Sequence, residues 1–124
     1  MPEGSRRVLV IDDEALLHPI YTRAAHLGGA EAVDVALTAS QAMDLLEEHH
    51  YRCILLDKNL PDLGGVALAE IIRHADPAAR IVVVTGYPSL ESAADAMRLG
   101  CFDYLAKPFQ MSRLIARVQA ALTG

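Results

Sequence analysis

Short apolar runs that alternate with helical segments constrain the fold of this chain more than any other feature. Three runs of four residues, 8–11, 53–56 and 81–84, are continuously apolar. Continuous runs are typical of strands that are buried on both faces of a sheet. Two other segments, 33–37 and 102–104, alternate apolar and polar residues, which favours strands with one wetter face. The sequence therefore predicts three central strands and two edge strands.

The segments between these strands carry helix signals. Thr38 and Gln41 form a capping box at the start of one helix, and the next helix carries the apolar residues Val66, Ile71 and Ile72. Strands that alternate with five helices predict an α/β fold of the flavodoxin-like, doubly wound type with a five-stranded parallel sheet. Because the alternating strands belong at the edges, we expect the strand order 2-1-3-4-5.

A single domain over residues 6–122 accounts for the whole pattern in this chain of 124 residues. Pro19 falls inside the first expected helix, where its ring would clash with the carbonyl group four residues earlier. That helix therefore either begins late, near His18, or is kinked, and the sequence leaves both possibilities open.

Composition and charge argue against several classes of function. Hydrophobic residues make up 52% of the chain, but its apolar runs are far shorter than a membrane span. The net charge is −5 and no basic cluster stands out beyond Arg6 and Arg7, so we expect no nucleic-acid binding by this domain. No signal segment is recognisable, and we expect a cytoplasmic protein whose Cys53 and Cys101 are free, buried thiols.

Acidic residues follow two of the buried strands where each strand ends. Asp12 and Asp13 come directly after the run 8–11, and Asp57 comes directly after the run 53–56. Ligands of an open parallel sheet bind at the carboxyl ends of its strands, at the point where the strand order reverses. The three carboxylates should converge there, and oxygen ligands of this kind favour Mg²⁺. The alternative is that the first two acids only cap the first helix.

Two other strand ends add a hydroxyl group and a cation. Thr85 ends the fourth strand, and Lys107 follows the fifth. Taken singly, each has an ordinary explanation, as a strand-end threonine and a solvated lysine. Together with the acids they supply what phosphoryl transfer requires, which is a metal, a cation and a hydrogen-bond donor around phosphoryl oxygens.

From about residue 7 to residue 122, the chain resembles the receiver domains of two-component response regulators. The matching motifs are Val-Ile-Asp-Asp-Glu at 10–14, Leu-Leu-Asp-Lys-Asn-Leu-Pro at 55–61 with Gly65, Val-Thr-Gly at 84–86 and Lys-Pro-Phe at 107–109. The resemblance implies that Asp57 accepts a phosphoryl group. It also implies that Asp12, Asp13 and Asp57 hold Mg²⁺ together with the backbone carbonyl of Asn59.

The resemblance assigns further roles to Thr85, Lys107 and Tyr104. Thr85 and Lys107 contact the phosphoryl group, and the peptide bond between Lys107 and Pro108 is expected to be cis. When the Thr85 hydroxyl moves toward the phosphoryl group, the ring of Tyr104 rotates inward and changes the face of the fourth helix, fifth strand and fifth helix. The alternative for Tyr104 is an ordinary edge-strand tyrosine.

The implied phosphodonor is a phosphohistidine on a sensor histidine kinase or a phosphotransfer protein, or else a small phosphodonor. We expect no enzyme in the usual sense, because the domain would catalyse only its own aspartyl phosphorylation and dephosphorylation. The face that switches is the one through which a homodimer would form.

Two residues near the acceptor depart from the usual pattern of the family. Lys58 directly follows Asp57, where an apolar residue is common, and it either points into solvent or attracts phosphodonors. Tyr87 lies two residues after Thr85, at a position that affects the access of water to the acyl phosphate. A ring there predicts slow hydrolysis, unless it is an ordinary exposed loop residue.

Two other functions compete with the phosphoacceptor. A receiver-like adaptor would bind partners without being phosphorylated. Four intact residues argue against it, namely Asp13, Asp57, Thr85 and Lys107. A phosphatase of the haloacid dehalogenase type also uses strand-end aspartates and Mg²⁺. Its first motif is Asp-x-Asp, however, whereas Asp12 and Asp13 are adjacent.

Overall fold

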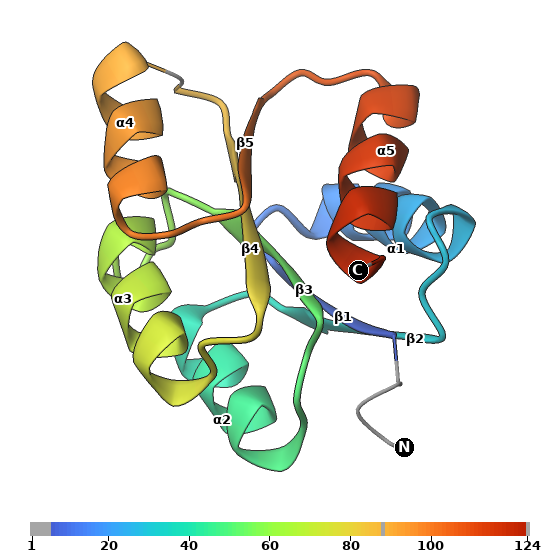
Figure 1. Cartoon of the computed structure of the whole chain (residues 1–124), viewed down its shortest axis with the longest axis horizontal. Helices are drawn as coiled ribbons and strands as arrows, with labels where there is room; N and C mark the ends of the chain where they lie inside the picture. Colours follow the sequence, from blue (N-terminus) through green and yellow to red (C-terminus); the bar gives the residue numbers. More distant parts are fainter. Residues whose placement is uncertain (1–5, 88, 124) are drawn as a thin grey trace.

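The computed structural model describes residues 6–87 and 89–123, which form a parallel sheet with helices on both faces (Figure 1). The strand order is β2-β1-β3-β4-β5, so the predicted flavodoxin-like, doubly wound fold is confirmed. The strands are β1 (Arg7–Ile11), β2 (Ala32–Ala36), β3 (Cys53–Asp57), β4 (Arg80–Thr85) and β5 (Asp103–Ala106). The helices are α1 (His18–Leu27), α2 (Ala39–Glu48), α3 (Gly65–Ala75), α4 (Leu90–Arg98) and α5 (Met111–Leu122).

The helices pack on the sheet in two groups. Helices α1 and α5 cover one face, and α2, α3 and α4 cover the other (Figure 1). In β1, Val8 and Val10 belong to the core under α1 and α5, whereas Leu9 and Ile11 belong to the core under α2, α3 and α4. Each central strand therefore buries both of its faces, which is why its sequence is continuously apolar.

The edge strands β2 and β5 lie within two residues of the segments predicted for them. In β2, Val35 is 43% exposed while Ala36 is fully buried. The strand therefore has one wetter face, as the alternating pattern indicated, but that face carries the apolar Val35 and not Ala36.

Helix α3 buries one apolar face and leaves two of its large apolar residues partly exposed. Its buried side chains include Leu68, Ala69 and Ile72, whereas Val66 and Ile71 are each 42% exposed. The buried positions lie on one face at helical spacing, and the two exposed residues fall outside that face. Of the three apolar residues noted in the sequence, only Ile72 lies on the buried face.

Helix α1 begins late, near His18, which is the first of the two possibilities that Pro19 left open. A 3-10 turn (Ala15–Leu17) precedes it, and the helix starts at His18 with the proline in its first turn. The N–H groups of the first turn have no intrahelical partner in any helix. A proline, which lacks an N–H, is therefore tolerated there without a kink.

A glycine is required where the segment after β3 folds against the start of α3. A Cβ atom at Gly65 would lie 2.6 Å from the Cα of Lys58, which is closer than real contacts allow. The Gly65 N–H also donates to the Lys58 carbonyl at 2.8 Å. This close approach fixes the loop that begins immediately after Asp57.

Both cysteines are buried free thiols, Cys53 in β3 and Cys101 just before β5, as the sequence predicted. Among the helices of residues 6–87 and 89–123, none combines the length and the apolar character that crossing a membrane requires.

Candidate functional site

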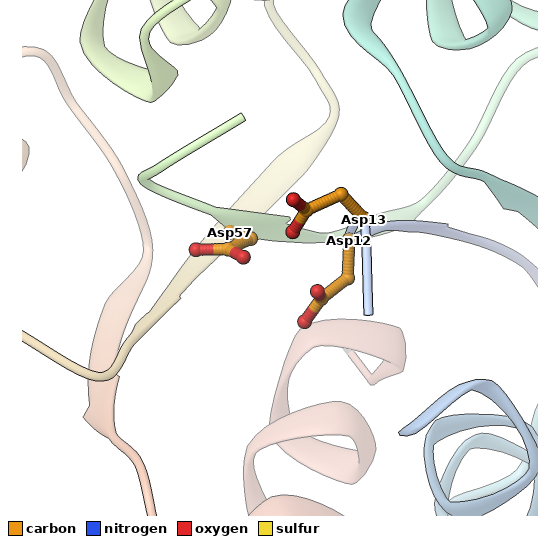
Figure 2. Close-up of side chains that lie close together, drawn as sticks. All are labelled: Asp12, Asp13 and Asp57. Carbon is orange, nitrogen blue, oxygen red and sulfur yellow. The ribbon is translucent and has the colours of Figure 1, made fainter. Parts of the chain in front are cut away.

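Three carboxylates meet at the carboxyl ends of β1 and β3. Asp57 is the last residue of β3, and Asp12 and Asp13 follow directly after β1. One oxygen atom from each carboxylate lies within 4.8 Å of those of the other two, and Figure 2 shows the side chains around a common space. Asp12 and Asp57 are buried, whereas Asp13 is exposed. The residue at the N-cap of α1 is Leu17, so the alternative in which these acids only cap that helix is wrong.

Lys107 is the cation of this site. Its Nζ donates to Asp12 Oδ2 and to Glu14 Oε1, each at 2.8 Å, and lies 3.5 Å from Asp57 Oδ2. The lysine side chain is only 12% exposed. One buried ammonium group therefore faces several carboxylates at once, and it also reaches the acid predicted to be the phosphoacceptor.

Thr85 and Lys107 are held side by side where β4 and β5 end. Thr85 pairs with Ala106 in the sheet, and its carbonyl accepts a hydrogen bond from the Lys107 N–H at 2.7 Å. The Thr85 side chain is fully buried, and its hydroxyl oxygen accepts the N–H of Tyr87 at 3.0 Å. The peptide bond between Lys107 and Pro108 is cis, as the resemblance implied. The backbone thus brings the predicted hydroxyl donor and cation to the same edge as the acids.

Asn59 lies in the loop that follows the phosphoacceptor candidate. Its N–H donates to Asp57 Oδ1 at 3.0 Å, and it forms an isolated bridge with Gly64 across the loop. These contacts turn the chain back toward the acids. Asn59 therefore lines the same cleft as Asp57.

Burial and neighbouring charges shift the pKa values of the acids and of the lysine in this site. Burial raises the pKa of Asp57 to about 6, opposed by the hydrogen bond from the Asn59 amide and reinforced by the charge of Asp12. Burial acts on Asp12 as well, but hydrogen bonds, above all from Lys107, hold its pKa below the ordinary value. Burial also opposes the charge of Lys107, but its hydrogen bonds to Asp12 and Glu14 raise its pKa. At neutral pH the site therefore holds ionised acids and a firmly charged lysine.

The acids lie at the polar side of a cleft with a volume of about 1020 Å³. One side of the cleft is apolar and comes from the start of α1 and the loop between β5 and α5. The residues that line the cleft are Asp13, Glu14, Leu17, Ile20, Asp57, Asn59, Gly86, Tyr87, Lys107, Pro108, Phe109 and Met111. The cleft therefore has room for a small ligand beside Asp57.

The remaining predicted residues lie around this centre. Tyr87 is 77% exposed and lines the cleft. Lys58 is half-buried and lines a separate, small pocket beside Gly65 and Val66 rather than the cleft. Tyr104 is half-buried in β5 and packs against the core under α2, α3 and α4. Of these three side chains, only Tyr87 shares the cleft with the acids.

Three residues that contact the site had no role assigned from the sequence. Glu14 binds Lys107, Tyr21 donates from its hydroxyl to Asp12 Oδ2 at 2.8 Å, and a ring nitrogen of His18 lies 2.6 Å from the Asp12 carbonyl oxygen. Glu14 could have been suspected because it adjoins the two aspartates. The other two lie on α1, and no sequence signal fixes how that helix is rotated toward the sheet.

The donor set of the site suits a hard divalent cation. Asp12, Asp13 and Asp57 offer only carboxylate oxygens, which is the chemistry that Mg²⁺ and Ca²⁺ prefer. These acids and Glu14 carry more negative charge than Lys107 neutralises. The three aspartates can therefore hold a metal ion that offsets the excess charge.

Comparisons with known proteins agree with this geometry. The family model described as the response regulator receiver domain matches residues 8–119. The two-component response regulator PhoP of Pseudomonas aeruginosa is 32% identical over 117 residues, which are 94% of this chain and 51% of PhoP. The chain thus spans about half the length of that relative.

Solved structures of similar proteins have the same fold. A CheY-like receiver domain protein from Methanospirillum hungatei superposes with a TM-score of 0.87 at 27% identity, covering 95% of this chain and 94% of that one. A Burkholderia pseudomallei response regulator solved with a phosphorylated aspartic acid, a calcium ion and citrate gives 0.83 at 30% identity, covering 95% and 69%. On the match to the family model and the shared fold, this chain belongs to the response regulator receiver domains.

Proposed function

We propose that Asp57 of this domain accepts a phosphoryl group in a Mg²⁺-dependent transfer from a sensor histidine kinase or a phosphotransfer protein, and that this event switches a partner-binding face. One observation carries the proposal. Three carboxylates lie within 4.8 Å of one another, and the ammonium group of Lys107 binds one of them and reaches the acceptor at 3.5 Å. Membership of the receiver family supports the same assignment.

Asp12, Asp13 and Asp57 would hold the metal, with the backbone carbonyl of Asn59 as the further ligand that the resemblance implies. Bound there, Mg²⁺ would neutralise charge on the carboxylates and on the phosphoryl oxygens. The Burkholderia regulator supports this assignment, because it was solved with a phosphorylated aspartic acid and a calcium ion, which also prefers oxygen ligands.

Asp57 is the nucleophile in the proposed transfer. One of its carboxylate oxygens attacks phosphorus, so that an O–P bond forms while the N–P bond to the donor histidine breaks and its electron pair remains on the imidazole. Since burial raises the pKa of Asp57 only to about 6, the carboxylate is ionised at neutral pH. Lys107 offsets the charge on the phosphoryl oxygens. The domain catalyses only its own phosphorylation and dephosphorylation.

The proposed switch begins at Thr85. Its hydroxyl oxygen accepts the Tyr87 N–H at 3.0 Å, and moving that hydroxyl toward the phosphoryl group breaks this bond. The space left behind admits the ring of Tyr104, which is half-buried here. The face of α4, β5 and α5 then changes shape and binds a partner or a second copy of the domain.

Two side chains would modulate the reaction. Tyr87 lies at the rim of the cleft, where its ring slows the attack of water on the acyl phosphate. Lys58 directly follows the acceptor, and its charge adds to the attraction of phosphodonors. We place the whole reaction in the cytoplasm, where the phosphodonors predicted from the sequence act.

The experiment is incubation of the chain with acetyl phosphate, with and without Mg²⁺, followed by measurement of the intact mass. We expect one phosphoryl group per chain, only when Mg²⁺ is present, with the acid and base lability of an acyl phosphate. Asp57→Asn should take up none. Asp34→Asn, which removes a carboxylate on β2 far from the acceptor, should be phosphorylated like the unchanged chain.

Two outcomes would replace the proposal. If saturating Mg²⁺ and acetyl phosphate give no increase in mass, the domain is a receiver-like adaptor. If a phosphate ester is hydrolysed over many cycles without a stable adduct, the domain is a phosphatase.

A further inference from the structure

We infer that Tyr21 is a positioning residue of the metal site, because its buried hydroxyl fixes the carboxylate of Asp12 from α1. The inference rests on the proposed function, since it concerns the binding of Mg²⁺ by the same acids. The carboxyl ends of β1 and β3 supply the acids themselves, whereas Tyr21 comes from a helix that packs against the sheet.

The ring of Tyr21 is enclosed on all sides. The residue is 1% exposed and belongs to the core between the sheet, α1 and α5. Its hydroxyl donates to Asp12 Oδ2 at 2.8 Å, and its ring centroid lies 5.8 Å from that of Phe109. Phe109 belongs to the loop that carries Lys107. One rigid side chain therefore contacts both the acid and the loop of the cation.

Asp12 is the most firmly held acid of the cluster. Its Oδ1 accepts the Glu14 N–H at 2.9 Å, and its Oδ2 accepts from both Tyr21 and Lys107. Asp13, in contrast, is exposed to solvent. The cluster thus combines one fixed carboxylate with one that is free to adjust to a ligand.

Tyr21 and Lys107 both bind Asp12, but only the lysine changes partners in the proposed reaction. Lys107 is shared among Asp12, Glu14 and Asp57, and it must turn toward the phosphoryl oxygens when transfer occurs. The tyrosine hydroxyl has no such second task. It stays on Oδ2 and keeps Asp12 oriented while the lysine moves.

Removing the hydroxyl should therefore weaken the metal site. Without it, the Oδ2 atom of Asp12 is held by Lys107 alone, so the lysine is tied to Asp12 and the carboxylate loses its fixed orientation when the lysine turns away. Both changes oppose the binding of a cation. A hydroxyl that served stability alone would change the free energy of unfolding and leave the affinity for Mg²⁺ as it was.

A second buried tyrosine supplies a matched control. Tyr51 is 2% exposed, and its hydroxyl donates to Asp34 Oδ2 at 2.7 Å, away from the acid cluster. Tyr21→Phe and Tyr51→Phe each remove one buried hydroxyl from a carboxylate and keep the ring. We expect calorimetric titration to show about fivefold weaker Mg²⁺ binding for Tyr21→Phe and unchanged binding for Tyr51→Phe.

A double-mutant cycle shows whether the effect passes through Asp12. In an Asp12→Asn background, Tyr21→Phe should weaken Mg²⁺ binding no further. In an Asp13→Asn background, it should weaken binding by the full factor. Equal factors in the two backgrounds would overturn the inference.

The unchanged chain gives a readout that needs no variant to fold. Saturating Mg²⁺ should shift the ring resonances of Tyr21 and leave those of Tyr51 in place. If the chain binds Mg²⁺ but Tyr21→Phe binds it equally well, or if the Tyr21 resonances do not respond, the inference is wrong and the proposed function stands. If the unchanged chain binds no Mg²⁺, the proposed function itself fails.

Discussion

Two buried tyrosines each donate a hydrogen bond to a carboxylate that also binds a basic side chain. Each tyrosine, carboxylate and basic side chain form one set, and the two sets lie in different parts of the sheet. Tyr51 and Arg7, near the amino ends of β3 and β1, bind Asp34 Oδ2 at 2.7 and 3.2 Å. At the carboxyl ends, Tyr21 and Lys107 both bind Asp12 Oδ2 at 2.8 Å. The two tyrosine hydroxyls therefore bind their carboxylates at nearly the same distance.

The two sets differ in their surplus of charge. Asp34 and Arg7 balance each other, and this arrangement is complete without a ligand. At the carboxyl ends, Asp13, Asp57 and Glu14 are added to the set, and within residues 6–87 and 89–123 no second basic side chain pairs with these acids. Like charges this close are stable only when a cation joins them or when one acid keeps its proton. A tyrosine–carboxylate–cation set is therefore structural when its charge is balanced, and it becomes a candidate ligand site when carboxylates are in excess.

The largest difference should appear when Asp57 loses its charge. In metal-free protein we expect Asp57→Asn to raise the free energy of unfolding by about 3 kcal/mol at pH 8, because the buried carboxylate no longer has to ionise. The pKa of Asp57 is about 6 in the folded chain and 3.8 in its reference state. Between these values the folded state binds the extra proton, so the unchanged chain loses stability as the pH rises.

The gain from Asp57→Asn should therefore be complete above about pH 6 and absent below about pH 4. Urea unfolding at several pH values measures it. A loss of stability at pH 8 would show that Asp57 is already balanced by its neighbours, as Asp34 is.

The next effect concerns the affinity for metal. Asp13→Asn should weaken Mg²⁺ binding about tenfold, because the site loses one of its charged oxygen ligands. Asp13 is exposed, so we expect little change in the unfolding midpoint. Calorimetric titration measures the affinity, and unchanged binding would exclude Asp13 from the metal site.

At the balanced set, the same kind of change should act on stability instead. Asp34→Asn should lower the free energy of unfolding by about 1 kcal/mol, because it weakens the bonds to Arg7 and Tyr51 at a partly exposed position. Mg²⁺ binding should stay as it is. A weaker affinity for Mg²⁺ would contradict the separation of the two sets.

The smallest effect is expected for Glu14→Gln. The carboxylate of Glu14 binds Lys107 at 2.8 Å but is 58% exposed, so water screens most of its charge. We expect Mg²⁺ affinity to change about twofold or less. A change as large as that for Asp13→Asn would place Glu14 among the metal ligands.

The sequence predicted most of the acid cluster because strand ends are a topological property. Asp12, Asp57 and Lys107 each lie at or just after the end of a strand, and parallel strands bring these ends to one edge. The contacts of Tyr21 and of Tyr51 could not be predicted in the same way. They depend on the rotation of α1 and on side-chain packing between segments that are far apart in the chain.

Helix α3 is a second case in which the sequence does not show how a helix is rotated toward the sheet. Val66 and Ile71 are large and apolar, but Leu68, Ala69 and Ile72 are the residues that face the sheet. The sequence shows which residues of the helix are apolar, but the rotation of α3 decides which of them face the sheet.

The central claim is that Asp57, and not one of its neighbouring acids, receives the phosphoryl group. Borohydride reduction of the phosphorylated chain converts an aspartyl phosphate to homoserine, and peptide mapping then identifies the position. The account predicts homoserine at position 57, only after treatment with Mg²⁺ and the phosphodonor. Homoserine at position 12 or 13, or at no position in a chain that has bound Mg²⁺, would contradict it.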